Sequence, residues 1–171
     1  MKSIMADRSL PHDTEAEQAL LSAILVHNAA YDRVSRFLRP RHFAIRVHRH
    51  IFAAIGQLIE HGRLANPVTL TNFFDRRDAL HEIDGGDYLI RLAGAAGSLI
   101  NAEDYGNTIY DLYLRRQLIT LAKEMVSDAY AQDLEHSAVD LIEAAKQRLL
   151  DLANGAARER PQSAIVASIC P

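Results

Sequence analysis

Histidine is the residue type in this sequence best suited to chemistry, because it ligates metals and transfers protons near neutral pH. The 171-residue chain contains eight histidines but one cysteine, Cys170. His48 and His50 are two positions apart, so on a helix their side chains point about 200° apart and cannot share a metal ion as an i, i+4 pair can. No H-E-x-x-H motif is present. We therefore interpret the histidines as packing or solvent-facing residues and expect no metal site.

The acidic residues and glycines also lack catalytic spacing. The G-x-x-x-x-G-K-[S/T] loop, whose backbone amides and lysine hold nucleotide phosphates, is absent from the sequence. We therefore expect no bound cofactor and no ATP hydrolysis by this chain, and no other enzymatic activity is indicated. The acids of the second half of the chain form no paired-carboxylate pattern and are interpreted as solvated helix faces: Asp104, Asp111, Glu124, Asp140 and Glu143.

A basic stretch between residues 31 and 50 is the strongest charge signal. Its six arginines, opposed there by Asp32 alone, are Arg33, Arg36, Arg39, Arg41, Arg46 and Arg49. One interpretation is a surface for an acidic partner or for a phosphate backbone. The other is a solvated helix face that acids elsewhere in the fold balance. The net charge of -3 indicates at most weak DNA binding.

Composition places the chain among ordinary globular proteins, with 49% hydrophobic and 24% charged residues. One thiol cannot form an internal disulfide, which favours a reducing, cytoplasmic setting. No apolar run approaches the roughly 18–20 residues of a membrane span, so we expect no membrane partner.

Apolar residues recur at helical spacing, which predicts an all-α fold. Thr14 and Glu17 have the spacing of a capping box and are predicted to begin the first helix. Gly62 is placed to end the third helix, and Thr69 or Thr71 to open the fourth. The five short helices of a compact head are expected at about 14–26, 31–38, 46–61, 69–74 and 88–97.

Two longer helices are predicted after the head, at about 101–131 and 137–154, with Ser137 capping the second and Asn154-Gly155 ending it. They predict a long antiparallel helical hairpin. The predicted domains are a flexible arm at 1–10, the globular head at 11–100, the hairpin at 101–154 and a linker or tail at 155–171.

The hairpin is also the predicted self-association surface. Its apolar seam consists of Leu112, Ile119, Met125, Val126, Ile142, Leu149 and Leu152. This seam could be internal packing alone. A two-helix hairpin buries only one face of each helix, however, and further leucines off the seam are expected to stay exposed in a monomer: Leu114, Leu118, Leu121, Leu141 and Leu150.

Four phrases resemble the amino-terminal domain of DnaB-type replicative helicases. They occur in that family's order, and the resemblance covers about residues 10–154. The phrases are Leu10–Leu21, His42-Phe43 with His48–Phe52, Gly85–Leu89, and Asn101–Tyr105 with Leu114–Ile119.

The resemblance implies a function in DNA replication. In that family this domain forms dimers, arranged as a collar on a hexameric ring (a trimer of dimers), and docks the carboxy-terminal domain of primase. A helicase loader is a further implied partner, and the replisome in the cytoplasm is the implied location. The family's motor, which uses ATP and Mg²⁺, lies further along the chain than the residues matched here.

Two alternatives stay open from the sequence. The chain could be a freestanding, truncated DnaB-like regulator or a weak DNA-binding protein. It could also be a relative of the helicase-binding domain of primase, which shares the head-and-hairpin form, although the Leu10–Leu21 phrase favours the helicase side.

Overall fold

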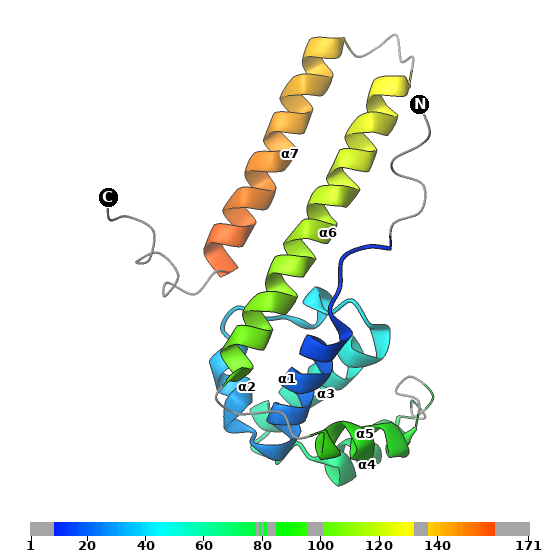
Figure 1. The fold of residues 1–171 in the computed structure, drawn as a ribbon, viewed down its shortest axis with the longest axis vertical. Coiled ribbons are helices and arrows are strands. Elements are labelled where there is room, and N and C mark those ends of the chain that lie inside the picture. Colours follow the sequence, from blue (N-terminus) through cyan, green and yellow to red (C-terminus); the bar gives the residue numbers. More distant parts are fainter. Residues whose placement is uncertain are drawn as a thin grey trace, which may run out of the picture. The chain divides into compact units, whose positions relative to one another are not determined.

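Every regular element that the computed structural model describes is a helix, which confirms the expected all-α fold (Figure 1). The structure describes residues 9–77, 79, 81, 85–95, 101–131 and 137–159, and no strand occurs among them. The arm before residue 9 and most of the predicted tail, with Cys170, lie outside these residues. The elements are α1 (Thr14–Val26), α2 (Ala29–Val34), the 3₁₀ helix η1 (Pro40–His42), α3 (Arg46–Glu60), α4 (Pro67–Asp75), α5 (Gly86–Gly94), α6 (Ala102–Tyr130) and α7 (Ala138–Glu159).

The chain divides into two compact units within α6, between Tyr113 and Leu114. The unit His12–Tyr113 is called the head unit below. The unit formed by Met1–Pro11 and Leu114–Pro171 is called the hairpin unit. No helix in the described part of the chain is long and apolar enough to cross a membrane.

The core of the head unit is built around α1 and α3. Helix α1 packs against α2, α3 and α5, while α4 packs against α3 and α5. Among the largest side chains buried in this core are Leu20, Leu21, Ile24, Phe37, Phe43, Phe52 and Ile55. On α3, Ile51, Ile55 and Leu58 recur at three or four positions and give that helix an apolar face, whereas α1 is buried on nearly every side from Leu20 to Leu25.

The cap of α1 differs from the prediction. Asp13, not Thr14, is the N-cap, and its Oδ1 accepts the Ala16 N–H at 2.9 Å. The predicted Thr14–Glu17 capping box is therefore wrong. Glu17 points into the head unit, where its side chain is 2% exposed.

Two other helix boundaries differ as well. Helix α4 begins at Pro67, because Asn66 caps it by accepting the Thr69 N–H at 2.9 Å and proline suits the first helical position. The predicted start at Thr69 or Thr71 is wrong. Helix α7 continues past the predicted stop at Asn154-Gly155 to Glu159, since one glycine inside a helix costs only about 1 kcal/mol.

The end of the third helix agrees with the sequence. Gly62, with a φ of 69°, follows the C-cap of α3, and its N–H donates to the Ile59 carbonyl at 2.9 Å. The second helix is shorter than predicted, since α2 ends at Val34 and η1 follows at Pro40.

Gly106 lies where the first turns of α6 meet the head core. A Cβ at this position would come within 3.0 Å of the side chains of both Phe37 and Val34. A glycine inside a helix is normally unfavourable relative to alanine. Here it permits a close approach, and a Cβ would require Phe37 or Val34 to move by a few tenths of an ångström.

We expect Gly106→Ala to lower the free energy of unfolding by about 1 kcal/mol. Overpacking a filled core costs roughly 1–3 kcal/mol, and the better helix propensity of alanine returns about 1 kcal/mol of that. Urea denaturation monitored by circular dichroism would measure the change. Gly155→Ala is the matched control, because that helical glycine has nothing within 4 Å of an added Cβ. Equal stability of the two variants would contradict the close approach at Gly106.

Candidate interaction surfaces

The two helices of the hairpin unit pack together side by side (Figure 1). They are the portion of α6 from Leu114 onward and α7. None of the residues of α7 is buried, although this helix carries a stripe of leucine, isoleucine, valine and alanine. Burial of one apolar face is the usual source of helix stability in proteins. Helix α7 has such a face, but α6 covers it only in part, because Leu141, Ala145 and Leu152 are half-buried and no residue of the helix is buried.

A reciprocal cap begins α7. Ser137 Oγ accepts the Asp140 N–H at 3.2 Å, and Asp140 Oδ2 accepts the Ser137 N–H at 2.9 Å. The predicted cap at Ser137 is confirmed. Asp140, predicted to be a solvated acid, forms the second half of a capping box that the Ser-x-x-Asp spacing could have indicated.

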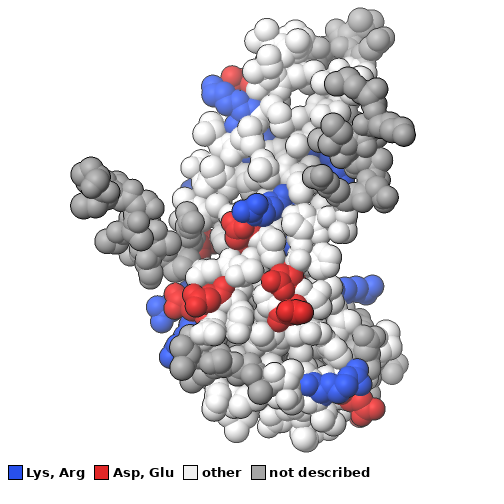
Figure 2. Space-filling view, in the orientation of Figure 1, with Lys and Arg blue, Asp and Glu red and all other residues white. Residues whose placement is uncertain are grey.

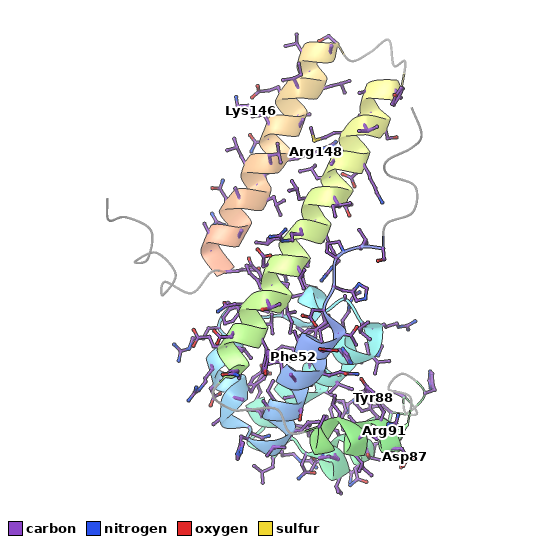
Figure 3. All side chains as sticks on the ribbon, in the orientation of Figure 1. Phe52, Asp87, Tyr88, Arg91, Lys146 and Arg148 are labelled. Atoms are coloured by element: carbon purple, nitrogen blue, oxygen red, sulfur yellow. The ribbon has the colours of Figure 1, made fainter. Side chains whose placement is uncertain are left out.

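A groove of about 300 Å³ runs between α6 and α7. Its apolar lining residues are Met125, Ala129, Ala138, Leu141, Ile142, Ala144 and Ala145. At its edge Arg148 Nη1 lies 3.1 Å from Asp128 Oδ2. Figure 3 shows Arg148 on the side of α7 toward α6 and Lys146 on the opposite side. Because both partners of the ion pair are nearly half exposed, the pair orients the two helices more than it stabilises them.

Large apolar side chains of this unit are exposed to a degree that is unusual for a monomer. Tyr130 is 84% exposed, Val139 72% and Ile142 68%. Leu118, Val126, Leu149 and Leu150 are exposed as well. Large apolar side chains left exposed in this number are typical of a site of contact with other proteins.

The predicted seam residues occupy different positions in this arrangement. Met125 and Ile142 come from different helices and line the groove together. Val126 and Leu149 are exposed, while Ile119 and Leu152 are half-buried. Leu112 belongs to the head unit instead. Val139 and Tyr130 are exposed apolar residues outside the predicted seam, although Val139 lies three residues before Ile142 and the spacing could have indicated it.

One of the leucines predicted to be exposed is not. Leu121 is only 8% exposed, so its predicted exposure is wrong. Leu118 and Leu150 are exposed as predicted, and Leu114 and Leu141 are half-buried.

The six arginines of the basic stretch have two different roles. Arg49 Nε donates to the Phe43 carbonyl at 2.6 Å, and Arg39 Nη1 donates to the Leu38 carbonyl at 3.1 Å. These two guanidinium groups satisfy backbone oxygens at the ends of short helices. All six side chains are nevertheless exposed, the others being Arg33, Arg36, Arg41 and Arg46. Contact of this stretch with DNA or a partner stays a prediction.

A buried polar network joins three helices of the head unit. His48, 1% exposed, lies on α3 with Nδ1 2.6 Å from Glu17 Oε2 and Nε2 2.6 Å from Tyr88 Oη. Both ring nitrogens are therefore engaged, Nδ1 with the carboxylate and Nε2 with the tyrosine hydroxyl. Tyr88 lies on α5 (Figure 3), and Gln18 Nε2 donates to its hydroxyl at 3.4 Å.

The Glu17 carboxylate also accepts hydrogen bonds from the backbone at the start of α3. No side chain at its N-cap position, Ile45, caps this helix. Glu17 Oε1 accepts the Ala44 N–H at 2.6 Å, and its Oε2 accepts the Ile45 N–H at 3.3 Å. A negative charge is favourable at this positive end of a helix dipole. The Glu17–His48 pair is thus shielded from solvent, and we interpret it as a structural contact that holds α1 against α3.

A second histidine is buried by aromatic packing. His42, 0% exposed, accepts the Arg39 N–H at Nδ1 at 3.0 Å. Its ring centroid lies 4.9 Å from that of Tyr110 and 4.5 Å from that of Tyr113. No group of three or more histidine, cysteine or acidic residues among the described positions could hold a metal ion.

Replacing Glu17 by alanine is expected to lower the free energy of unfolding by about 3–5 kcal/mol, because it leaves the buried His48 ring and the half-buried N–H groups of Ala44 and Ile45 without their acceptor. Glu15→Ala is the matched control on the same helix turn, where the side chain is exposed; a change within about 0.5 kcal/mol is expected there. Chemical denaturation of both variants measures the difference. Similar losses in the two would mean that the buried network contributes little.

The arrangement of the helices indicates a class of protein, and comparison with known proteins then identifies the family. A small all-helical unit and a pair of packed long helices present apolar and charged surfaces outward, which is typical of a protein-interaction module. The DnaB-like helicase N terminal domain family matches residues 9–111, and the chain belongs to it.

Relatives with known names extend the match beyond those residues. Replicative DNA helicase DnaB of Rickettsia bellii is 40% identical over 158 residues, 92% of this chain. The DnaB of a Nostoc species is 32% identical over 94% of the chain. The chain spans about a third of the R. bellii protein and less of the Nostoc protein (32% and 18%). It is therefore homologous to the N-terminal region of replicative helicases.

Solved structures agree on the fold. The N-terminal domain of the Mycobacterium tuberculosis DnaB helicase is similar with a TM-score of 0.76 and 29% identity, over 84% of this chain and 99% of that one. A DnaB-like replicative helicase, studied for its interactions with primase, has a TM-score of 0.66 and 21% identity over 82% of this chain and 31% of that one.

Proposed function

We propose that this chain is the collar-forming and recruiting module of a replicative helicase. It self-associates through the hairpin unit and presents a docking surface to primase at the replisome in the cytoplasm. DNA unwinding, with its ATP and Mg²⁺, belongs in this proposal to a motor outside these residues. The observation that carries the proposal is α7, an apolar-faced helix of 22 residues without a buried side chain.

The energetics of the hairpin surface favour a second copy as its cover. Seven large apolar side chains of α6 and α7 are exposed, and full burial of one such side chain contributes roughly 1.5–3 kcal/mol. Their removal from water could therefore supply on the order of 10 kcal/mol. Loss of translational and rotational freedom on association costs about 4–15 kcal/mol. A partner that buries an identical surface doubles the apolar gain, which supports a two-fold dimer in which both copies use the same face.

Leu149→Asp is expected to shift the chain from dimer toward monomer. A buried carboxylate at an apolar interface is strongly unfavourable, so dimer affinity should fall by about tenfold or more. Native mass spectrometry or sedimentation over a concentration series would measure the shift. Asn154→Asp adds the same charge at an exposed polar position of α7 and should leave the mass unchanged. An unchanged mass for Leu149→Asp would mean that the face packs only within one chain.

Primase is the partner that we propose for the assembled module. Support comes from the family membership and from the DnaB-like helicase whose structure was solved for its interactions with primase. A helicase loader is a second proposed partner, and a hexameric ring built as a trimer of dimers is the proposed assembly.

Mixing the chain with the carboxy-terminal domain of primase from the same organism should give a complex. Native mass spectrometry would detect it, and isothermal titration would give its affinity. We expect Leu149→Asp to weaken the complex, if docking uses the dimer, and Asn154→Asp to leave it unchanged. A strict monomer without affinity for the primase domain would exclude this function while leaving the fold as described.

Direct DNA binding is the weaker alternative. Figure 2 shows that the charged side chains on the visible face lie in small separated groups of both signs. Strong binding to a phosphate backbone requires a continuous basic stripe. Among the described residues on this face no such stripe is visible, which makes direct DNA contact the weaker proposal.

A further inference from the structure

The head unit contains a second surface, which the hairpin does not share. A groove of about 630 Å³ lies between α2 and α3, and we call it the α2–α3 groove. Leu38, Phe52 and Ile59 contribute apolar lining, and Tyr31 lies beside Phe52 with ring centroids 5.4 Å apart. Its volume suits one or two large apolar side chains from another molecule.

A glycine of α3 makes room for the Tyr31 hydroxyl beside this groove. Gly56 lies in the interior of α3 and lines the groove. A Cβ at this position would come within 2.6 Å of the Tyr31 hydroxyl. Glycine in a helix interior costs roughly 0.5–1 kcal/mol relative to alanine. That cost is accepted at a position where any side chain would displace Tyr31.

The rim of the α2–α3 groove is acidic. Asp32 and Glu60 both line it. The one cation there, Arg39, donates to the carbonyl groups of Ser35 and Leu38. Burial raises the pKa of the Tyr31 hydroxyl, the charges of Glu60 and Asp32 raise it further, and Arg39 opposes the shift. Apolar lining beside two carboxylates favours an apolar side chain that has a basic neighbour.

A smaller pocket of opposite charge lies next to this groove. It has a volume of about 190 Å³, and its charged or titratable lining residues are His61, Arg63 and Arg77, with no acid among them. The guanidinium of Arg77 lies 3.7 Å from the centroid of the Phe73 ring, which holds the cation at the pocket. We call this the basic pocket. Its chemistry suits a carboxylate.

One residue connects the two sites. Gln57 lines both the α2–α3 groove and the basic pocket, so they adjoin across the last turns of α3. Asp32 and Glu60, on one side of Gln57, would repel the phosphates of a nucleic acid, and they would repel an acidic peptide in the same way. A ligand with both charges, correctly spaced, satisfies both sites.

We propose that the head unit binds a short segment of a partner protein across α3. A large apolar side chain enters the α2–α3 groove, a neighbouring lysine or arginine faces Asp32 and Glu60, and an aspartate or glutamate a few residues away enters the basic pocket. This site goes beyond self-association through the hairpin and does not depend on it.

Selection from a random peptide library displayed on phage, against the immobilised full chain, tests this proposal. The expected result is a consensus that combines a basic residue, a large apolar residue and an acidic residue. Selection on Glu60→Lys should replace the basic position by an acidic one, and selection on Arg77→Glu should replace the acidic position by a basic one. Binding of the best wild-type peptide should fall about tenfold on either variant.

A change in binding by these variants can be attributed to the site, because neither substitution is expected to disturb the fold. Both altered side chains are exposed, and lysine is favourable in the last turn of a helix, so circular dichroism should show intact folds. Arg46→Glu, exposed on α3 outside both sites, is the matched control and should keep the wild-type consensus. The absence of any consensus, or a consensus that neither reversal alters, would overturn the proposal. Loss of binding on Ile142→Asp alone would place the peptides on the hairpin and overturn it too.

Discussion

The buried carboxylate of Glu17 is the constraint on which the head unit depends. An ionised group removed from water must have its hydrogen bonds satisfied, or its burial costs several kcal/mol. Glu17 meets this requirement with the N–H groups of Ala44 and Ile45 and with the ring of His48. Apolar faces alone would allow α1 and α3 to slide past each other. The carboxylate allows one register, since it must reach the first turn of α3.

Periodicity in the sequence was sufficient to predict helices, their approximate order and the long hairpin, because burial of one face imposes a spacing of three or four residues. It was insufficient at α1, where Asp13 and Thr14 are both good caps. Glu17 is in the position of a local capping partner, but its acceptor capacity is used by backbone 27 residues away. Tyr88, which completes the network from α5, has no local signal at all. Contacts between distant segments decide such cases, and one sequence read alone does not contain them.

Of the candidate surfaces, the sequence indicated the hairpin seam but neither of the two sites on the head unit. The seam along the hairpin follows from spacing, and the structure brings Met125 and Ile142 to one groove. Leu112 could not be assigned, because contacts with distant segments decide to which unit a turn of α6 belongs. Leu121 lies in the hairpin unit as expected but is buried there, which spacing alone did not indicate. The two sites flanking Gln57 were invisible in the sequence, since they depend on the absence of a side chain at Gly56 and on a turn that brings Arg63 and Arg77 to one pocket.

The lack of buried side chains in α7 links the folding of this helix to the assembly of the module. A helix that buries no side chain of its own has little local stability, and its backbone opens at a small energetic cost. If the cover is another subunit, folding of α7 and assembly are one linked equilibrium, and mass action governs both. The supply of newly made chains in the cell would then determine how much of this helix exists at any moment. In that case a subunit without a neighbour would present an opened segment that proteases can cut.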